Sequence, residues 1–169
     1  MQESNSQRNQ FSVAPIGWIH TPIHQSKGTS IQGAVANGAE GRIELLPEFL
    51  PGLQDLEGFE RIWLIYLLDR ASAYRLQVSP YLEDKEHGVF ATRAPARPNP
   101  IGLTAVQLLG IEDNRLLISG VDMLDGTPLL DIKPYIPAFD CFPVQRVGWY
   151  QGKIVQGAVA DNRFENQSR

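Results

Sequence analysis

The sequence has almost no cysteine and no long apolar run. Cys141 is its one cysteine, so no internal disulfide can form, and a reducing compartment is the natural environment. No stretch approaches the roughly 20 apolar residues that a membrane-spanning helix requires. Met1–Gln10 is polar and lacks the hydrophobic core of a secretion signal. These absences predict a cytoplasmic protein without a membrane anchor.

The motifs of several common chemistries are also absent. There is no glycine-rich dinucleotide-binding loop, no phosphate loop of the GxxxxGK(S/T) type and no GxSxG nucleophile elbow. The three histidines, His20, His24 and His87, lack acidic or cysteine neighbours at metal-ligand spacing, so we expect no metal centre. Cys141 has no histidine nearby and is interpreted as a small core residue rather than a nucleophile.

Positive charge is scarce. Lys and Arg total 15 against 19 Asp and Glu, the formal net charge is −4, and the sequence pI is about 5.3. Proteins that grip nucleic acid through a broad phosphate-binding surface are usually basic. If this chain binds RNA, it must use a local basic pocket, a partner or weak contacts.

What is present is a chain of 169 residues, 43% of them apolar. These values predict one domain with a hydrophobic core, which we place at residues 11–160, between polar tails at 1–10 and 161–169. Strands are expected over Phe11–His20, Ala34–Leu46, Glu60–Leu68, Gly88–Thr92 and Leu129–Ile132, and in a hairpin of Gly102–Ile111 with Arg115–Val121. Pro47–Phe59 is expected to form only short helical turns, because Pro51 and Gly52 interrupt it. The pattern is typical of a mainly all-β sandwich or barrel.

Two segments combine polar side chains with backbone constraints. In FATRAPARPNPIGLT, residues 90–104, three prolines stiffen a loop that carries Arg93, Arg97 and Asn99. In DMLDGTPLLDIKPY, residues 122–135, Gly126 suits a turn with positive φ, and three acids lie close to Lys133. Taken alone, the first could be a surface loop with solvated arginines, and the second a hairpin turn with an ion pair.

Two further segments are weaker candidates. The polar loop His20–Gly33 could present the amide of Gln32 to a ligand, although a plain connecting loop is the simpler interpretation. Asp69 and Arg70 follow directly after the apolar segment Glu60–Leu68. Polar groups at the end of a core strand often line the mouth of a barrel, but they can equally be solvated charges at a strand terminus.

The signature segments resemble a known family. ATRAPARPNPIGLT and DGTPLLDIKPY closely resemble the paired signatures of the TsaA-like family, whose members are tRNA N6-threonylcarbamoyladenosine methyltransferases. IGWIHTP and FERIWLIYLLDR are similar to the family's matching stretches, so the resemblance covers roughly Ile16 to Pro143. It implies a small single β-barrel with short helical turns and long loops, which binds S-adenosylmethionine and forms a homodimer with active sites near the interface.

The resemblance also implies a set of site residues. The cofactor pocket would draw on Ser30, Ile31, Gln32, Asp69, Arg70, Arg93, Leu103, Asp125, Gly126, Thr127 and Pro128. Arg97, Asn99 and Lys133 would face the substrate. Asp69, Lys133 and Tyr135 are the candidate catalytic residues, and Asp125 is a further candidate base. This chain departs from bacterial members at Ser30-Ile31-Gln32, where they carry an Arg-Gln pair, and at Asp69, where histidine is common.

The implied reaction is methyl transfer to N6 of threonylcarbamoyladenosine in the tRNA anticodon loop. In such a displacement the protein mainly supplies position and electrostatics. Two alternatives stay open at this point. The chain could be an S-adenosylmethionine-dependent methyltransferase of a small metabolite or another RNA, or a non-catalytic barrel that binds a nucleoside-like ligand.

Overall fold

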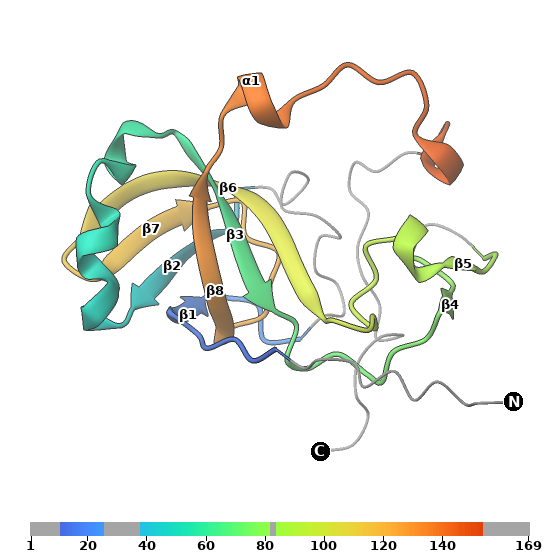
Figure 1. Cartoon of the computed structure of the whole chain (residues 1–169), viewed down its shortest axis with the longest axis horizontal. Helices are drawn as coiled ribbons and strands as arrows, with labels where there is room; N and C mark the ends of the chain where they lie inside the picture. Colours follow the sequence, from blue (N-terminus) through green and yellow to red (C-terminus); the bar gives the residue numbers. More distant parts are fainter. Residues whose placement is uncertain (1–10, 26–37, 82–83, 154–169) are drawn as a thin grey trace, which may run out of the picture.

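The fold is dominated by a closed barrel of six antiparallel strands. The computed structural model describes residues 11–25, 38–81 and 84–153. The barrel strands are β1 (Gly17–His20), β2 (Glu40–Leu45), β3 (Arg61–Leu67), β6 (Ile101–Glu112), β7 (Arg115–Ser119) and β8 (Thr127–Pro134). They follow one another around the barrel in the order β1-β2-β7-β6-β3-β8, and β8 closes the barrel by pairing with β1 (Figure 1).

Smaller elements surround the barrel. β4 (Gln77–Val78) and β5 (His87–Gly88) form a separate two-stranded sheet beside it (Figure 1). The helical elements are the 3-10 turns η2 (Pro47–Leu53), η3 (Leu56–Gly58), η4 (Val89–Ala91) and η5 (Gly148–Tyr150) and one turn of α-helix, α1 (Pro137–Asp140). Among the residues described, no helix is long and apolar enough to cross a membrane.

Alternating burial along the strands explains why the barrel has a core. In β3, Ile62, Leu64 and Tyr66 point inward and are buried, while the residues between them are exposed or half-buried. Such period-2 alternation is what a strand with one face toward a barrel interior requires. Ile19, Ile43, Val106, Leu116 and Leu129 meet them in one cluster.

The predicted mainly all-β barrel and the predicted strand character of Glu60–Leu68 are confirmed. The β6–β7 hairpin also forms, and it turns at Asp113 and Asn114, where Asp113 has φ 53. The short helical turns expected in Pro47–Phe59 are η2 and η3.

Several expected strand limits are wrong. The strand expected over Gly88–Thr92 ends at Gly88, because residues 89–91 form a 3-10 turn closed by the Thr92 hydroxyl, which donates to Val89 O. β1 begins only at Gly17, since Pro15 has no N–H to donate to a sheet. β7 ends at Ser119, before Gly120 with its φ of 88. β8 extends beyond Leu129–Ile132 at both ends.

Cys141 is exposed, so its interpretation as a core residue is wrong. The segment after β8 leaves the barrel and is exposed from Pro137 to Gly148. Its end returns to the side of the small sheet (Figure 1). The Trp149 indole there donates to Ala91 O at 2.7 Å and stacks on His87 with ring centroids 4.8 Å apart.

Close packing requires glycine at position 102. Gly102 pairs with Tyr66 across β3 and β6, and a Cβ there would lie 2.1 Å from the Tyr66 ring. We expect Gly102→Ala to lower the free energy of unfolding by about 1–3 kcal/mol through overpacking. Gly110→Ala is the matched control on the same strand, since nothing lies within 4 Å of its added Cβ. Urea unfolding of both variants tests this, and equal stability of the two would contradict it.

Candidate functional site

The end of β3 and the connection between β7 and β8 meet at one end of the barrel. The Arg70 guanidinium donates to the backbone carbonyl of Asp125, and Arg70 Nε lies 3.8 Å from the Asp69 carboxylate. Gly126 has φ +75, and a Cβ there would lie 3.5 Å from Arg70 Nη2. The structure therefore brings together Asp69, Arg70, Asp125 and Gly126, from two of the segments predicted to bind the cofactor.

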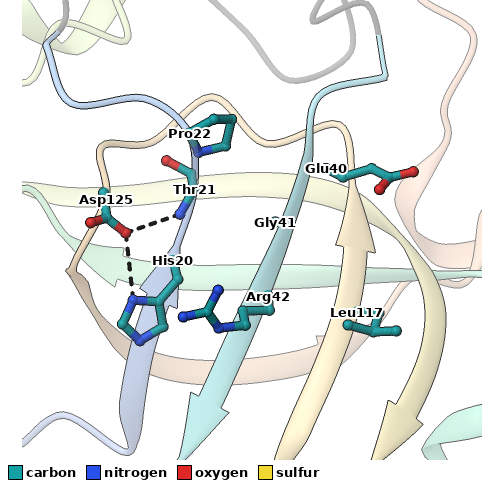
Figure 2. A pocket seen from close by; sticks show the side chains of 8 residues that line it. All are labelled: His20, Thr21, Pro22, Glu40, Gly41, Arg42, Leu117 and Asp125. Atoms are coloured by element: carbon teal, nitrogen blue, oxygen red, sulfur yellow. Dashed lines mark hydrogen bonds and ion pairs between the residues drawn. The ribbon is translucent and has the colours of Figure 1, made fainter.

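The Asp125 carboxylate is fixed by the chain that leaves β1 (Figure 2). The Thr21 N–H donates to Asp125 Oδ1 at 3.1 Å. His20 Nδ1 lies 3.5 Å from the same oxygen, and His24 Nδ1 lies 3.8 Å from Oδ2. Burial acts to raise the pKa of Asp125, but the Thr21 N–H and the two histidines outweigh it and hold the pKa below its usual value. Asp125 is therefore a weaker base than an ordinary aspartate, which counts against it as the proton acceptor.

Thr127 and Pro128 belong to strand β8 rather than to the turn. The Thr127 hydroxyl donates to Leu124 O at 2.7 Å and is buried. Pro128 is half-buried and pairs with Trp18 of β1. The positive φ predicted for Gly126 is confirmed.

The proline-stiffened loop before β6 uses one of its arginines internally. The Arg97 guanidinium donates to Thr92 O and Ala94 O, both at 3.2 Å, so it braces the loop. Arg93 and Asn99 are exposed, and half of the Leu103 side chain is exposed on the outer face of β6. The loop that carries Arg93 leads into β6 at Ile101, which pairs with Leu67 at the end of β3, so the loop reaches the same end of the barrel as Arg70.

Lys133 and Tyr135 lie at the opposite end of the barrel. Lys133 pairs with Trp63 across β8 and β3, and Asp69 comes six residues after Trp63. β3 runs on from Trp63 to Leu67, so at about 3.3 Å per strand residue Lys133 lies roughly 13 Å from the strand end that Asp69 follows. Lys133 Nζ is 2.7 Å from the Asp131 carboxylate, and the Tyr135 ring lies 5.5 Å from that of Trp63. Within one chain, the three predicted catalytic residues do not form a cluster.

Ser30, Ile31 and Gln32 lie outside the residues that the structure describes. Within the described ranges, no group of three or more histidine, cysteine or acidic side chains is placed to hold a metal ion.

Two polar arrangements were missed by the sequence reasoning. A hollow of about 530 Å³ lies beside Asp125, and His20, Thr21, Pro22, Glu40, Gly41, Arg42 and Leu117 line the rest of it (Figure 2). Asp125 alone belongs to the predicted set. The second arrangement joins Tyr66, Thr104 and Asp122 inside the barrel. No spacing along the chain reveals either one, because both depend on strand register.

Comparison with known proteins bears directly on this site. The family model for the tRNA-methyltransferase O N-terminal domain matches residues 18–141. The chain belongs to this family. The match contains Asp69, Arg70, the loop with Arg93, and the turn at Asp125. The family predicted from the signature segments is thereby confirmed, and with it the S-adenosylmethionine-dependent tRNA methyltransferase class to which the family's named enzymes belong.

Relatives within the family are similar over most of this chain. A probable S-adenosyl-L-methionine-binding protein of Pyrococcus abyssi is 50% identical over 152 residues, which cover 89% of this chain and 83% of the relative. The tRNA (adenine(37)-N6)-methyltransferase of Mus musculus is 35% identical over 133 residues, which cover 75% of this chain and 31% of the mouse protein. The crystal structure of TrmO from Pseudomonas aeruginosa superposes with a TM-score of 0.71 at 41% identity, covering 83% of this chain and 63% of that one.

Because folding lowers the pKa of Asp125, the free energy of unfolding depends on pH in the acid range. A carboxyl group whose pKa is depressed by folding stabilises the folded state above its unfolded pKa, here 3.8, and loses this contribution as the pH falls through the folded pKa. Asp125→Asn removes the titration. We therefore expect its free energy of unfolding to fall less steeply than that of the wild type as the pH drops from about 5 to about 2.5.

Urea unfolding at each pH measures this slope. Asp113→Asn, which changes an exposed aspartate in the β6–β7 turn, is the matched control and should follow the wild type. Parallel curves for Asp125→Asn and the wild type would show that the histidines and the Thr21 N–H do not stabilise the carboxylate.

Proposed function

We propose that this protein is an S-adenosylmethionine-dependent methyltransferase that acts on adenosine 37 of tRNA, with N6 of threonylcarbamoyladenosine as the acceptor. The observation that carries the proposal is that the family match spans nearly the whole barrel, including the end where Asp69, Arg70, Asp125 and Gly126 converge. The chain spans 63% of the Pseudomonas TrmO chain and 31% of the mouse enzyme. The acceptor is therefore inferred from proteins of which this chain corresponds to only a part.

The charges at this end of the barrel fit the cofactor. S-Adenosylmethionine carries a carboxylate, an ammonium and a sulfonium group, and here the Arg70 and Arg93 guanidiniums lie on the same side of the barrel as the Asp69 and Asp125 carboxylates. Arg93, which is exposed, would hold the cofactor's carboxylate or lie against its adenosine. The backbone around Gly126 would meet the adenine. When bound, the cofactor supplies the methyl group and its leaving group.

The acceptor nitrogen of a carbamoylated adenine is weakly basic, so its proton needs an acceptor. Asp69 is the carboxylate proposed to accept this proton at the Arg70 end, because the lowered pKa of Asp125 counts against that group. The anticodon-loop base must also be unstacked to reach any pocket on the protein. Lys133 and Asn99 remain the proposed substrate-side residues, and Arg97 would act by bracing the loop that carries Asn99.

A methyl-transfer assay tests the acceptor. With radiolabelled S-adenosylmethionine, we expect label in tRNA that carries threonylcarbamoyladenosine 37 and none in the same tRNA with unmodified adenosine. Arg93→Ala is the control for cofactor dependence. It should weaken cofactor binding about tenfold to a hundredfold, since a hydrogen bond to a charged group contributes about 1.5–3 kcal/mol.

The other outcomes of this assay are distinct. Label in unmodified tRNA would contradict the proposed acceptor and leave an adenosine methyltransferase. Cofactor binding without label in any RNA would favour a small-metabolite methyltransferase, and no cofactor binding by the folded protein would favour a ligand-binding barrel.

We also propose that the protein is a homodimer that associates through the outer face of β8, β3 and β6. On this face Ile101 and Leu103 are 47% and 50% exposed, and Ile65 and Leu67, their partners on β3, are half-buried. Exposed apolar patches on sheets commonly mark protein interfaces. A two-fold axis in the interface, perpendicular to the strands, would bring Lys133 and Tyr135 of the partner subunit toward Asp69 of the first.

Ile101→Glu tests this interface, because it introduces an unpaired charge that a packed interface must desolvate. We expect its mass in solution to fall from twice 18.8 kDa to 18.8 kDa. Leu109→Glu is the matched control, since Leu109 is 48% exposed on the same strand but lies beyond Gln107, where the pairing of β6 with β3 ends. Light scattering coupled to size-exclusion chromatography measures both variants. A monomeric wild type, or dissociation by the Leu109 variant alone, would contradict the proposed face.

A further inference from the structure

A chain of three polar side chains lies inside the barrel near the candidate site. Thr104 Oγ1 donates to Asp122 Oδ1 at 2.9 Å. Tyr66 Oη lies 3.0 Å from Thr104 Oγ1. A hydroxyl group has a single proton. With the Thr104 proton directed to Asp122, the Tyr66 hydroxyl is the donor that suits its contact with Thr104. The Asp122 carboxylate, which can only accept, ends the chain.

Filling the interior of the barrel does not by itself require this chain. Tyr66 and Thr104 are each 6% exposed. Burial, with the nearby charge of Asp122, raises the pKa of Tyr66 far above its usual value, so the phenol stays protonated and able to donate. Replacing both partners of a buried hydrogen bond by apolar groups of the same shape can leave stability nearly unchanged. A phenylalanine and a valine would fill the same space without any need for partners.

The positions of the three residues point to a different role. Tyr66 lies on β3, three residues before Asp69, and Thr104 lies on β6, directly after Leu103. Asp122 lies in the β7–β8 connection, three residues before Asp125. Backbone pairing already joins β3 to β6. The Thr104–Asp122 bond links the β7–β8 connection to them by side chains, at a sequence separation of 18.

We propose that Tyr66, Thr104 and Asp122 are positioning residues for cofactor binding, which hold the turn at Asp125 and Gly126 at a fixed distance from Leu103 and Asp69. This inference rests on the proposed cofactor site. Without the Thr104 hydroxyl, the side-chain link from Asp122 to β6 is lost. The turn that follows keeps its backbone contacts with β1, but its distance from Leu103 on β6 can change. A displacement of about 1 Å at a binding site is enough to cost a large part of its efficiency.

Thr104→Val and Thr104→Ser form a matched pair for the test. Valine keeps the shape of threonine and removes the hydroxyl, whereas serine keeps the hydroxyl and removes a methyl group. We expect the valine variant to bind S-adenosylmethionine about tenfold more weakly and the serine variant to bind like the wild type. Because the chain positions the cofactor, KM for the cofactor should rise more than kcat falls. Calorimetry, kinetics and thermal unfolding are measured on each variant.

Val106→Ala controls for loss of stability. Val106 is fully buried on the same strand and belongs to no polar chain, so this variant should melt at a lower temperature and keep its cofactor affinity. Wild-type affinity in Thr104→Val would overturn the proposal. So would equal losses of affinity in the serine and valine variants, or a loss in Val106→Ala that matches that of Thr104→Val.

Tyr66→Phe provides a second test should Thr104→Val fail to fold. It removes the first donor and keeps the ring over Gly102, and weaker cofactor binding is again the expected result. A folded wild type that binds no S-adenosylmethionine would contradict the cofactor site itself, and the positioning role with it. Failure of the site is thus distinguishable from failure of the positioning role alone.

Discussion

Closure of the barrel by β8 is the constraint on which the candidate site depends. β8 pairs with β1 through Thr127, Pro128 and Leu129, and with β3 from Leu129 to Pro134. The strand begins directly after Gly126, so the register with β1 fixes where the turn can lie. The backbone N–H groups of Asp125 and Gly126 donate to Ile23 O and Ile19 O, which extends the same contact beyond the strand. Arg70 then meets a turn that closure holds beside β1, while the Thr104–Asp122 bond ties the connection before it to β6.

This arrangement explains why part of the fold was predictable from the sequence. Tyr66, Leu64 and Ile62 alternate with half-buried residues within β3, and such a pattern is local. The positive φ of Gly126 could also be predicted from the sequence, because few other residues adopt a positive φ readily. The full length of β8 could not be read this way, since its extension to Pro134 depends on pairing with β3, which lies far away in sequence.

The candidate site was predictable to the same extent. Asp69 and Arg70 end one strand and Asp125 precedes another, so closure of the sheet brings them together. Lys133 stands in the same sequence motif as Asp125, but the motif is an extended strand, and each residue along it adds about 3.3 Å. Lys133 and Asp125 are therefore close in sequence but lie at opposite ends of the strand. Thr104 and Asp122 gave no local signal, because only the fold makes them neighbours.

The contact between Tyr66 and Gly102 also limits how the sequence can change over evolutionary time. A Cβ at position 102 would occupy the space that the Tyr66 ring fills. A larger residue at position 102 fits without overpacking once residue 66 has become smaller. A smaller residue 66 on its own leaves a cavity, which also lowers the stability of the fold. Both single steps lower fitness where stability is limiting. The two positions are therefore expected to exchange as a pair, through a narrow and ordered path, or to stay as they are.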